Sequence, residues 1–338
     1  MTRNKLLPAG VTVRQFQMED GQAVVDMFNR WSQALLGQNM EDLEEMSAFW
    51  KSNQIVLGKD AILAQASDGQ VIGYAEMPSN IPPFARMYAY ARVDPGWWGR
   101  GIGRFLLRWA EQQGRENIHR AEADIRVVAA QHVLENDAGA NALMVSEGYT
   151  HLRTSWLMEI GLDDDIPAPV LPDGVHIRGI QPTEEEYRRL FRTAQNAFRD
   201  HYGFVDLPFE QYYEMHMHYV KNEEHHPELY LVAEKDGEII GCSLCTPKSS
   251  IDEKMGWVNT LGVLREHRGG GIGSGLLKES FRALKRFGNT RAGLGVDSGS
   301  LTGAVRIYQR AGMKVMSAFN LYEKELRPGR DIIKRSLD

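Results

Sequence analysis

Cysteine is scarce in this sequence of 338 residues, which contains only Cys242 and Cys245. The two lie three residues apart in a segment that reads as a β-strand, so their side chains should point to opposite faces of a sheet. That placement disfavours a disulfide between them and a metal site shared by both. We predict that both are buried free thiols.

Long apolar runs are also absent. No stretch approaches the ~18 apolar residues of a membrane-spanning helix, and residues 1–10 lack the apolar centre of a signal peptide. An excess of positive charge is missing too, because the formal net charge is −6 at pH 7. These absences disfavour membranes and nucleic acids as partners. We expect a cytoplasmic monomer or homodimer that acts on small molecules.

Glycine is concentrated within residues 260–277, which read as a strand, a loop and then an amphipathic helix. The loop holds four closely spaced glycines, Gly269, Gly270, Gly271 and Gly273. They permit unusual backbone angles, so successive N–H groups at the start of the helix can converge on an anion such as a pyrophosphate. Apolar residues at helical spacing predict a helix over 272–287, with Gly288 as its C-terminal cap.

Two familiar glycine motifs do not fit this loop. A dinucleotide fingerprint G-x-G-x-x-G begun at Gly269 meets Ser274 at its last position, and one begun at Gly271 meets Leu276. A Walker loop begun at Gly270 also has Leu276 where lysine is required. The loop therefore belongs to neither class.

The segment Arg268-Gly-Gly-Gly-Ile-Gly273 instead resembles the R/Q-x-x-G-x-G/A signature of the GNAT superfamily of N-acetyltransferases. Downstream, residues 304–313 are similar to that family's A-x-x-x-Y-x-x-x-G-F segment, with Met313 in place of the phenylalanine. The resemblance implies acetyl-CoA as the cofactor and an amine as the acceptor. It also implies that the loop holds the pyrophosphate of coenzyme A and that the preceding strand lies beside the pantetheine arm. The cofactor-binding residues implied here are Leu261, Gly262, Val263, Arg268, Gly269, Gly270, Gly271, Ile272, Gly273 and Ser274.

By the same resemblance, Tyr308 stands near the cofactor sulfur and acts as the general acid that protonates the leaving thiolate. Its ordinary pKa of ~10 keeps the hydroxyl protonated at neutral pH. The general base stays open, because residues 257–261 of the strand contain no carboxylate. Asp252, Glu253 and Asp297 are candidates, and proton removal through ordered water is an equal alternative.

The glycine loop occurs twice. Val93 matches Val263 and Gly103 matches Gly273, both at a separation of 170 residues, so the chain is a tandem duplication. Acidic residues and three prolines within residues 161–173 indicate a linker between the copies. We predict an N-terminal domain over 1–163, a linker over 164–173 and a C-terminal domain over 174–338.

The first copy departs from the family pattern where chemistry is needed. Trp98 replaces the arginine of its loop, and Met144 stands where the second copy has Tyr308. We therefore predict that the first copy is degenerate and that catalysis takes place in the C-terminal domain. Cofactor binding by the first copy stays open, through Val93, Arg100, Gly101 and Gly103.

The order of expected elements is the same in both copies. In the first we expect strands over 11–16, 61–66, 71–77, 87–93, 124–130 and 149–160, and helices within 21–50, 102–113 and 138–147. With the resemblance, this order implies an α/β fold of two tandem GNAT-like domains. Each should have a mixed, mostly antiparallel sheet flanked by helices, in which two strands splay apart to admit the pantetheine arm.

The tandem arrangement resembles the two-domain members of the mycothiol synthase type. We therefore predict transfer of an acetyl group from acetyl-CoA to a primary amine of a small molecule by direct attack. Two alternatives are a non-catalytic acyl-CoA-binding regulatory module and an acetyltransferase for protein N-termini or lysines. No metal site is predicted, because His216 and His218 would face different ways on a helix and His225 and His226 lie in an acid-flanked segment.

Overall fold

The computed structural model describes residues 7–162, 165–221, 225–249, 252–299 and 303–333. The chain packs into two compact units. The first unit comprises Met1–Ser155 with Ser317–Ile332, and the second comprises Trp156–Met316 with Ile333–Asp338. Each unit has its own hydrophobic cores.

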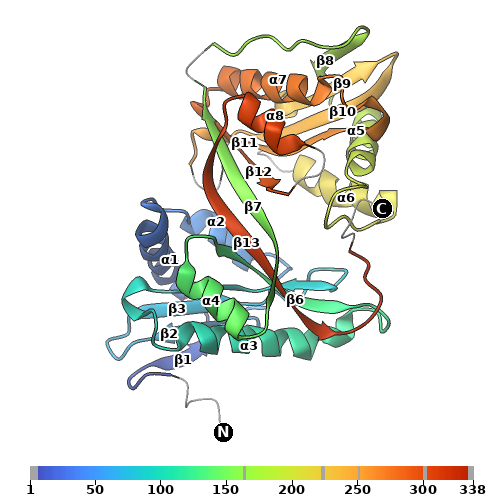
Figure 1. Cartoon of the computed structure of the whole chain (residues 1–338). Coiled ribbons are helices and arrows are strands. Elements are labelled where there is room, and N and C mark those ends of the chain that lie inside the picture. The colour runs from blue at the N-terminus through green and yellow to red at the C-terminus, as the bar shows by residue number, and fades with distance from the viewer. Residues whose placement is uncertain (1–6, 163–164, 222–224, 250–251, 300–302, 334–338) are drawn as a thin grey trace. The chain divides into compact units, whose positions relative to one another are not determined.

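The first unit contains most of the first copy (Figure 1). Its strands are β1 (Thr12–Gln15), β2 (Ala61–Gln65), β3 (Val71–Glu76), β4 (Arg86–Tyr88), β5 (Tyr90–Val93) and β6 (Val127–Leu134), and its helices are α1 (Gly21–Leu36), α2 (Leu43–Trp50), α3 (Ile102–Asn117) and α4 (Ala138–Ser146). The strand expected over 124–130 begins later and runs further. Residues 121–126 form a turn instead, in which Ile125 makes an isolated bridge with Arg330.

Alternate residues of β2 and β3 face two helical layers. On one face, Leu63 and Tyr74 pack with α1 and α2. On the other face, Ile62 and Ile72 pack with Ile102 of α3. This alternation is the period of two expected for strands covered on both faces. These strands form an antiparallel sheet in the order β1-β2-β3-β5.

The second unit repeats this order of elements. Its strands are β8 (Val175–Gly179), β9 (Tyr230–Lys235), β10 (Glu238–Thr246), β11 (Met255–Val263) and β12 (Arg291–Asp297), and its helices are α5 (Glu184–Ala197), α6 (Phe209–Val220), α7 (Ile272–Phe287) and α8 (Ala304–Arg310). The helix predicted over 272–287 is confirmed at both ends, and Gly288 caps it with a φ of 110°.

The two cysteines face different helical layers of the second unit. Cys242 belongs to the core beneath α5 and α6, and Cys245 belongs to the core beneath α7. Both are buried free thiols, as predicted. Burial raises the pKa of the Cys242 thiol to about 12 and that of Cys245 to about 11.

A parallel strand pair opens into a gap in each unit. In the second unit β11 and β12 pair from Met255↔Arg291 to Val258↔Leu294, and beyond that point β11 pairs with β10. In the first unit β4 and β6 pair as far as Tyr88↔Ala130, and the following β5 pairs with β3. We call the opening that follows the last residue pair the splayed gap. It lies between β11 and β12 in the second unit and between β5 and β6 in the first. The predicted fold class is confirmed, including these splayed pairs.

The last strands of the two copies, β7 (Thr150–Gly161) and β13 (Lys314–Arg327), are divided between the units. In the first unit, Ser317–Arg327 pairs antiparallel with β6, from Phe319↔Leu134 to Arg327↔Val127. In the second unit, Trp156–Gly161 lies next to β12. The packing units therefore divide the chain differently from the sequence repeat, which assigns each last strand to its own copy.

The predicted linker lies partly outside the described residues, at 163 and 164. Residues 165–173 contain no helix or strand and pack on α7 within the second unit. Arg282 donates from Nη1 to the carbonyl of Ile166 at 3.1 Å. A Cβ atom added to Gly275 would lie 2.5 Å from the Leu171 side chain, so this segment packs closely on α7.

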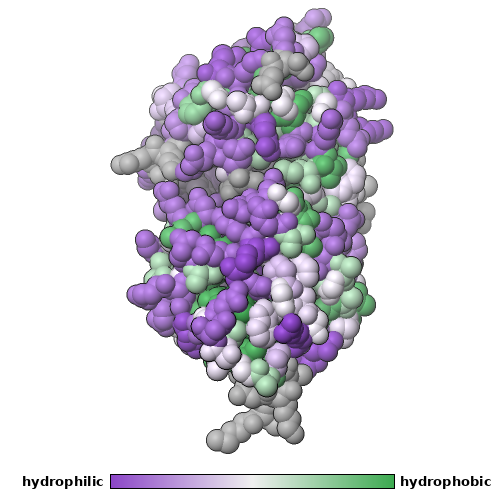
Figure 2. Space-filling view, turned by 90° about the vertical axis from the view of Figure 1, so that its left-hand side faces the viewer, coloured by the Kyte–Doolittle hydropathy of each residue, from purple (hydrophilic) through white to green (hydrophobic). Residues whose placement is uncertain are grey.

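None of the helices in the described ranges is both long enough and apolar enough to cross a membrane. Figure 2 shows one face of the molecule, on which hydrophilic side chains predominate and hydrophobic ones are scattered. Scattered single apolar residues are ordinary on protein surfaces.

Candidate active site

The glycine loop of the second unit has the geometry of an anion site. Gly269 and Gly271 have φ angles of 89° and 88°, a left-handed conformation that L side chains rarely adopt. Gly271 is the N-cap of α7, and no described side chain caps this helix. The N–H groups of the first helical turn are therefore available to an anion, which the helix dipole also favours.

The strand before the loop presents its edge to the splayed gap. Leu261, Gly262 and Val263 lie on β11 beyond its last pair with β12, and their ladder partners are on β10. Such an edge can hydrogen-bond an extended ligand as a surrogate strand. A Cβ atom on Gly262 would lie 2.9 Å from both Ala197 and Phe198, so the end of α5 packs directly on one face of this part of β11.

The predicted loop residues contribute backbone rather than side chains. The Ile272 side chain is buried in the core beneath α7, so this residue offers only its N–H to a ligand. Gly273 and Ser274 follow it in the first turn of α7. Next to them, a Cβ atom on Gly270 would lie 3.2 Å from Pro172 of the linker segment.

Arg268 is held inside the second unit by several acceptors. Its Nε donates to the carbonyl of Val263 at 3.0 Å and its Nη2 donates to that of Ala197 at 2.8 Å. The guanidinium also forms a two-pronged ion pair with Asp200. Arg268 lowers the pKa of Asp200 through these hydrogen bonds. The arginine of the family motif thus joins the end of α5 to the end of β11, and its charge is paired.

Replacing Arg268 with methionine should lower the free energy of unfolding by about 2–4 kcal/mol, because it leaves Asp200 and two carbonyls without their donor. Chemical denaturation measures this loss, and a double-mutant cycle with Asp200→Asn isolates the ion pair. Arg199→Met is the matched control. Arg199 is exposed and lies 3.9 Å from Asp206, so its loss should cost no more than about 0.5 kcal/mol. Equal effects of the two substitutions would contradict this role of Arg268.

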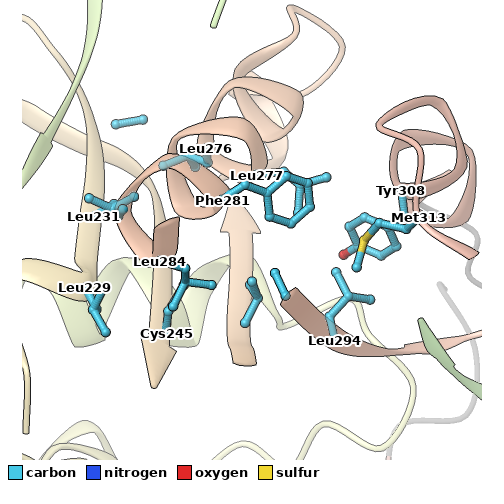
Figure 3. Packing of buried hydrophobic residues seen from close by; sticks show 14 of the residues in the cluster. Leu229, Leu231, Cys245, Leu276, Leu277, Phe281, Leu284, Leu294, Tyr308 and Met313 are labelled. Atoms are coloured by element: carbon cyan, nitrogen blue, oxygen red, sulfur yellow. The ribbon is translucent and has the colours of Figure 1, made fainter. Parts of the chain in front are cut away.

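Tyr308 lies on α8 with its side chain 7% exposed, in the core that also contains Val263 and Leu294. Figure 3 shows its ring beside Met313, with Leu294 nearby. Burial raises the pKa of Tyr308 to about 12. Among the described residues the hydroxyl has no hydrogen-bond partner. A protonated donor with no partner is suited to protonating a leaving group.

Two of the three candidate bases lie away from the splayed gap. Asp252 and Glu253 precede β11 and lie at its other end, and Asp252 is ion-paired with Arg291 at 3.4 Å. Six residues separate Glu253 from Asn259, where the gap begins, a distance of roughly 20 Å along a strand. Asp297 ends β12 at the gap, where its Oδ1 accepts from the N–H of Gly299 at 2.9 Å.

Sequence reasoning missed His201. Its ring packs edge-on against Phe198 with centroids 4.4 Å apart, and Phe198 in turn packs on Gly262 of β11. Burial lowers the pKa of His201 against the opposing effect of Asp200, so the neutral ring predominates at pH 7. Asp297 interacts electrostatically with this ring as well. The loop after α5 has no sequence motif, so only the fold reveals this neighbourhood.

The first unit contains a cavity of about 690 Å³ at its splayed gap, within the range of small-ligand sites. Val93, Gly101 and Gly103, all predicted to bind cofactor, line it, together with Gln131 of β6. Gly101 has a φ of 87° and is the N-cap of α3, which no described side chain caps. The first copy has therefore kept the anion loop and a space of suitable size beside it.

Trp98 replaces part of what Arg268 does. Its indole Nε1 donates to the carbonyl of Val93 at 2.9 Å, the same strand position that Arg268 reaches in the second unit. The tryptophan keeps this hydrogen bond but brings no charge. Arg100 lies over the Trp97 ring, 4.8 Å from its centroid, and does not belong to the described lining of the cavity.

No hydroxyl replaces Tyr308 in the first unit at the matching position. Met144 lies there on α4, only 2% exposed, in an apolar core. Methionine has no proton to give a thiolate. The first copy thus combines a cofactor-sized cavity with an apolar side chain at the place of the acid.

Two buried acids of the first unit lie near β5. Glu76 accepts from the hydroxyl of Tyr74 at 2.5 Å and from the indole of Trp50 at 3.3 Å. Burial raises the pKa of Glu76 to about 7. Glu41 accepts from the hydroxyl of Tyr90, and burial raises its pKa too.

The raised pKa of Glu76 predicts that stability falls between pH 4.5 and 7. In that interval the unfolded chain releases the proton that the folded chain keeps, and above it the free energy of unfolding levels off. Glu76→Gln keeps an acceptor for Tyr74 and Trp50 but cannot ionise. From pH 5 to pH 8, wild type should lose about 2–3 kcal/mol relative to this variant in urea unfolding. A difference that stays constant with pH would show that Glu76 ionises normally.

The histidines of α6 and of the segment after it make local contacts. His216 Nδ1 lies 2.8 Å from the carbonyl oxygen of Tyr212, and His225 Nε2 lies 2.7 Å from the hydroxyl of Tyr187. In the part of the chain that the structure describes, no group of three or more potential ligands is placed to hold a metal ion.

Two features define the class of acyl-CoA-dependent acyltransferases to which N-acetyltransferases belong. They are a mixed sheet with a splayed strand pair and a glycine loop that leads into a helix without a side-chain cap. Two stretches, residues 25–143 and 187–313, match the model of the acetyltransferase (GNAT) family. The chain belongs to this family as a tandem member and is an acetyl-CoA-dependent N-acetyltransferase.

Similar sequences include mycothiol acetyltransferases. The one from Thermobispora bispora is 27% identical over 264 residues, which cover 75% of this chain and 80% of the relative. The one from Streptomyces bingchenggensis is 29% identical over 272 residues, covering 78% and 79%.

Solved structures with both domains are similar as well. A GCN5-related N-acetyltransferase from Sphaerobacter thermophilus is 31% identical with a TM-score of 0.85, covering 96% of this chain and 98% of that one. A tandem GNAT protein from the clavulanic acid biosynthesis pathway has a TM-score of 0.71 at 15% identity, over 95% of this chain and all of that one, which shows the shared fold alone.

Proposed function

We propose that the second copy transfers the acetyl group of acetyl-CoA to a primary amine of a small molecule by direct attack. The observation that supports this choice of copy is Tyr308, a buried and protonated hydroxyl without a described partner. The first copy has Met144 in its place. The glycine loop and the splayed gap occur in both copies and do not distinguish them.

Acetyl-CoA, when bound, supplies an activated thioester. The N–H groups of residues 269–274 would hold its pyrophosphate, and the β11 edge at Leu261, Gly262 and Val263 would hold its pantetheine arm. One N–H of that edge would polarise the thioester carbonyl. Tyr308 would give its proton to the departing sulfur.

The amine must lose a proton to attack. Asp297 is the candidate base at the splayed gap, and an ordered water molecule is the alternative. His201, close to Asp297 and neutral at pH 7, lies where it could pass this proton to solvent. Both groups lie at the end of the gap nearest the glycine loop.

The acceptor class rests on the relatives, which are named mycothiol acetyltransferases and so act on a small molecule. Three of the acidic residues of α5 and α6 are already paired, which weakens the case for a basic protein substrate. Glu184 and Glu210 both contact Arg188, and Glu186 contacts Arg178.

The test is a release assay for the coenzyme A thiol with a panel of amines, confirmed by mass spectrometry of the product. The panel contains small primary amines, amino sugars, and peptides with free N-termini or lysines. Turnover of small amines alone supports the proposal, and turnover of peptides alone would assign the protein-acetylating alternative. Acetyl-CoA binding with no turnover of any amine would favour the regulatory module.

A further inference from the structure

The cavity of the first unit contains a buried cation that the glycine loop does not explain. Arg92 lines this cavity from β5 and is 8% exposed. Its Cζ lies 4.3 Å from the ring centroids of both Trp31 and Tyr90, so the guanidinium is fixed between two aromatic rings. Two well-placed rings orient a charged group without neutralising it.

The hydrogen-bonding capacity of Arg92 is largely unused. Within the described residues, its guanidinium makes one hydrogen bond, from Nη1 to the carbonyl of Ala91 at 2.8 Å, and its Nε has no partner. Glu41 and Glu76 are near enough to interact with Arg92 electrostatically, but neither forms a described ion pair with it. Burial raises the pKa of both carboxyl groups, which reduces the negative charge around Arg92. A buried guanidinium in this state is costly unless an anion joins it.

A second polar group points to a ligand in the same cavity. Gln131 is the first residue of β6 after the last pair with β4, and it is 7% exposed. Its Oε1 is buried and has no partner in the described part of the chain. A donor on β5 and an acceptor on β6 thus lie unpaired on the two strands that border the splayed gap. The amide groups of a pantetheine arm would offer partners of both kinds.

The second copy cannot carry a comparable cation. Gly262 stands at the position of Arg92, at a separation of 170 residues. Any side chain there would collide with Ala197 and Phe198, which lie 2.9 Å from the added Cβ atom. The two copies therefore differ in charge at one equivalent position, on β5 in the first unit and on β11 in the second.

We propose that the first copy binds an acyl-CoA whose acyl group ends in a carboxylate, such as succinyl-CoA, and that Arg92 receives this carboxylate. The loop at Gly101 would hold the pyrophosphate, and Trp31 and Tyr90 would keep the guanidinium aimed at the acyl end. The proposal rests on cofactor binding by the first-copy loop and does not depend on catalysis by the second copy. It makes the two copies sites for different acyl-CoA molecules.

The test uses the full chain with Gly271→Glu, so that only the first copy is available. Calorimetric titrations with succinyl-CoA and with acetyl-CoA give the ratio of their affinities. We expect succinyl-CoA to bind about tenfold more tightly or better, since a charge-assisted pair at a buried arginine contributes at least that much. Adding Arg92→Met should bring the ratio of succinyl-CoA affinity to acetyl-CoA affinity close to one. Arg92→Lys in its place should keep part of the preference for succinyl-CoA.

Arg104→Met is the matched control. Arg104 lines the same cavity but is ion-paired with Glu147 at 2.8 Å, so its loss should leave the ratio unchanged even if both affinities fall. Circular dichroism and thermal unfolding establish that each variant is folded.

Three results would overturn the proposal. Equal affinities for the two thioesters, with or without Arg92, would show that no carboxylate is recognised. An increase in acetyl-CoA affinity on adding free succinate, with no preference for succinyl-CoA, would place the carboxylate on a separate molecule. If Gly271→Glu bound neither thioester, the first copy would have no acyl-CoA site at all. That result would say nothing against catalysis by the second copy in the wild-type chain.

Discussion

Replacing Tyr308 with phenylalanine should lower turnover about 100-fold or more while acetyl-CoA affinity changes less than about twofold. The substitution removes only the hydroxyl, which is the proton donor, and leaves the ring to fill its place in the apolar core. Because the pKa of Tyr308 is raised to about 12, wild-type activity should also show no loss from deprotonation of this residue below about pH 11. Steady-state kinetics across pH and calorimetry on the variant measure both effects.

Tyr149→Phe is the matched control for this experiment. Tyr149 is also buried, at 4% exposure, and its hydroxyl has no partner among the described residues. It lies in a core of the first unit, so its replacement should leave turnover unchanged. Normal turnover in Tyr308→Phe would mean that this tyrosine only packs α8 against the sheet.

Replacing Gly271 with glutamate should weaken acetyl-CoA binding by the second copy at least 100-fold. The residue has a φ of 88°, which costs about 1–2 kcal/mol for any L side chain, and it is the N-cap whose neighbouring N–H groups would meet the pyrophosphate. A carboxylate there would also repel the phosphates. Isothermal calorimetry on the full chain counts the sites that remain.

Gly288→Glu separates strain from binding. Gly288 also has a left-handed φ, 110°, at the other end of the same helix, and no described atom lies within 4 Å of an added Cβ. It should lower stability by a similar amount and leave acetyl-CoA binding unchanged. Loss of binding in both variants would trace the effect to damage of α7 rather than to the loop.

Local features of the fold were predictable because they depend on neighbouring residues. The helix over 272–287 follows from apolar spacing and a terminal glycine, and both of its ends agree with the structure. The opposite facing of Cys242 and Cys245 follows from the alternation of a strand. The repeat of the glycine loop at a separation of 170 residues was sufficient to reveal two copies.

Features that join distant segments were not predictable. The partner of Arg268 is Asp200, 68 residues away in a loop without a motif. The strand that pairs with β6 belongs to the second copy, and no local pattern tells which copy's last strand completes a given sheet. Arg92 and Gln131 come together only because β5 and β6 border one cavity. Burial and pairing across the fold decide what these side chains can do.

The central claim is that the second copy catalyses acetyl transfer. The most direct test measures acetylation of the best amine substrate by full-length Gly101→Glu and Gly271→Glu, each at an acetyl-CoA concentration well below the wild-type KM, where the rate reports cofactor binding as well as chemistry. The account predicts that Gly101→Glu keeps most of the wild-type rate and that Gly271→Glu loses at least 99% of it, since only the second copy has Tyr308. The reverse pattern, with activity lost in Gly101→Glu and kept in Gly271→Glu, would place catalysis in the first copy and contradict the account.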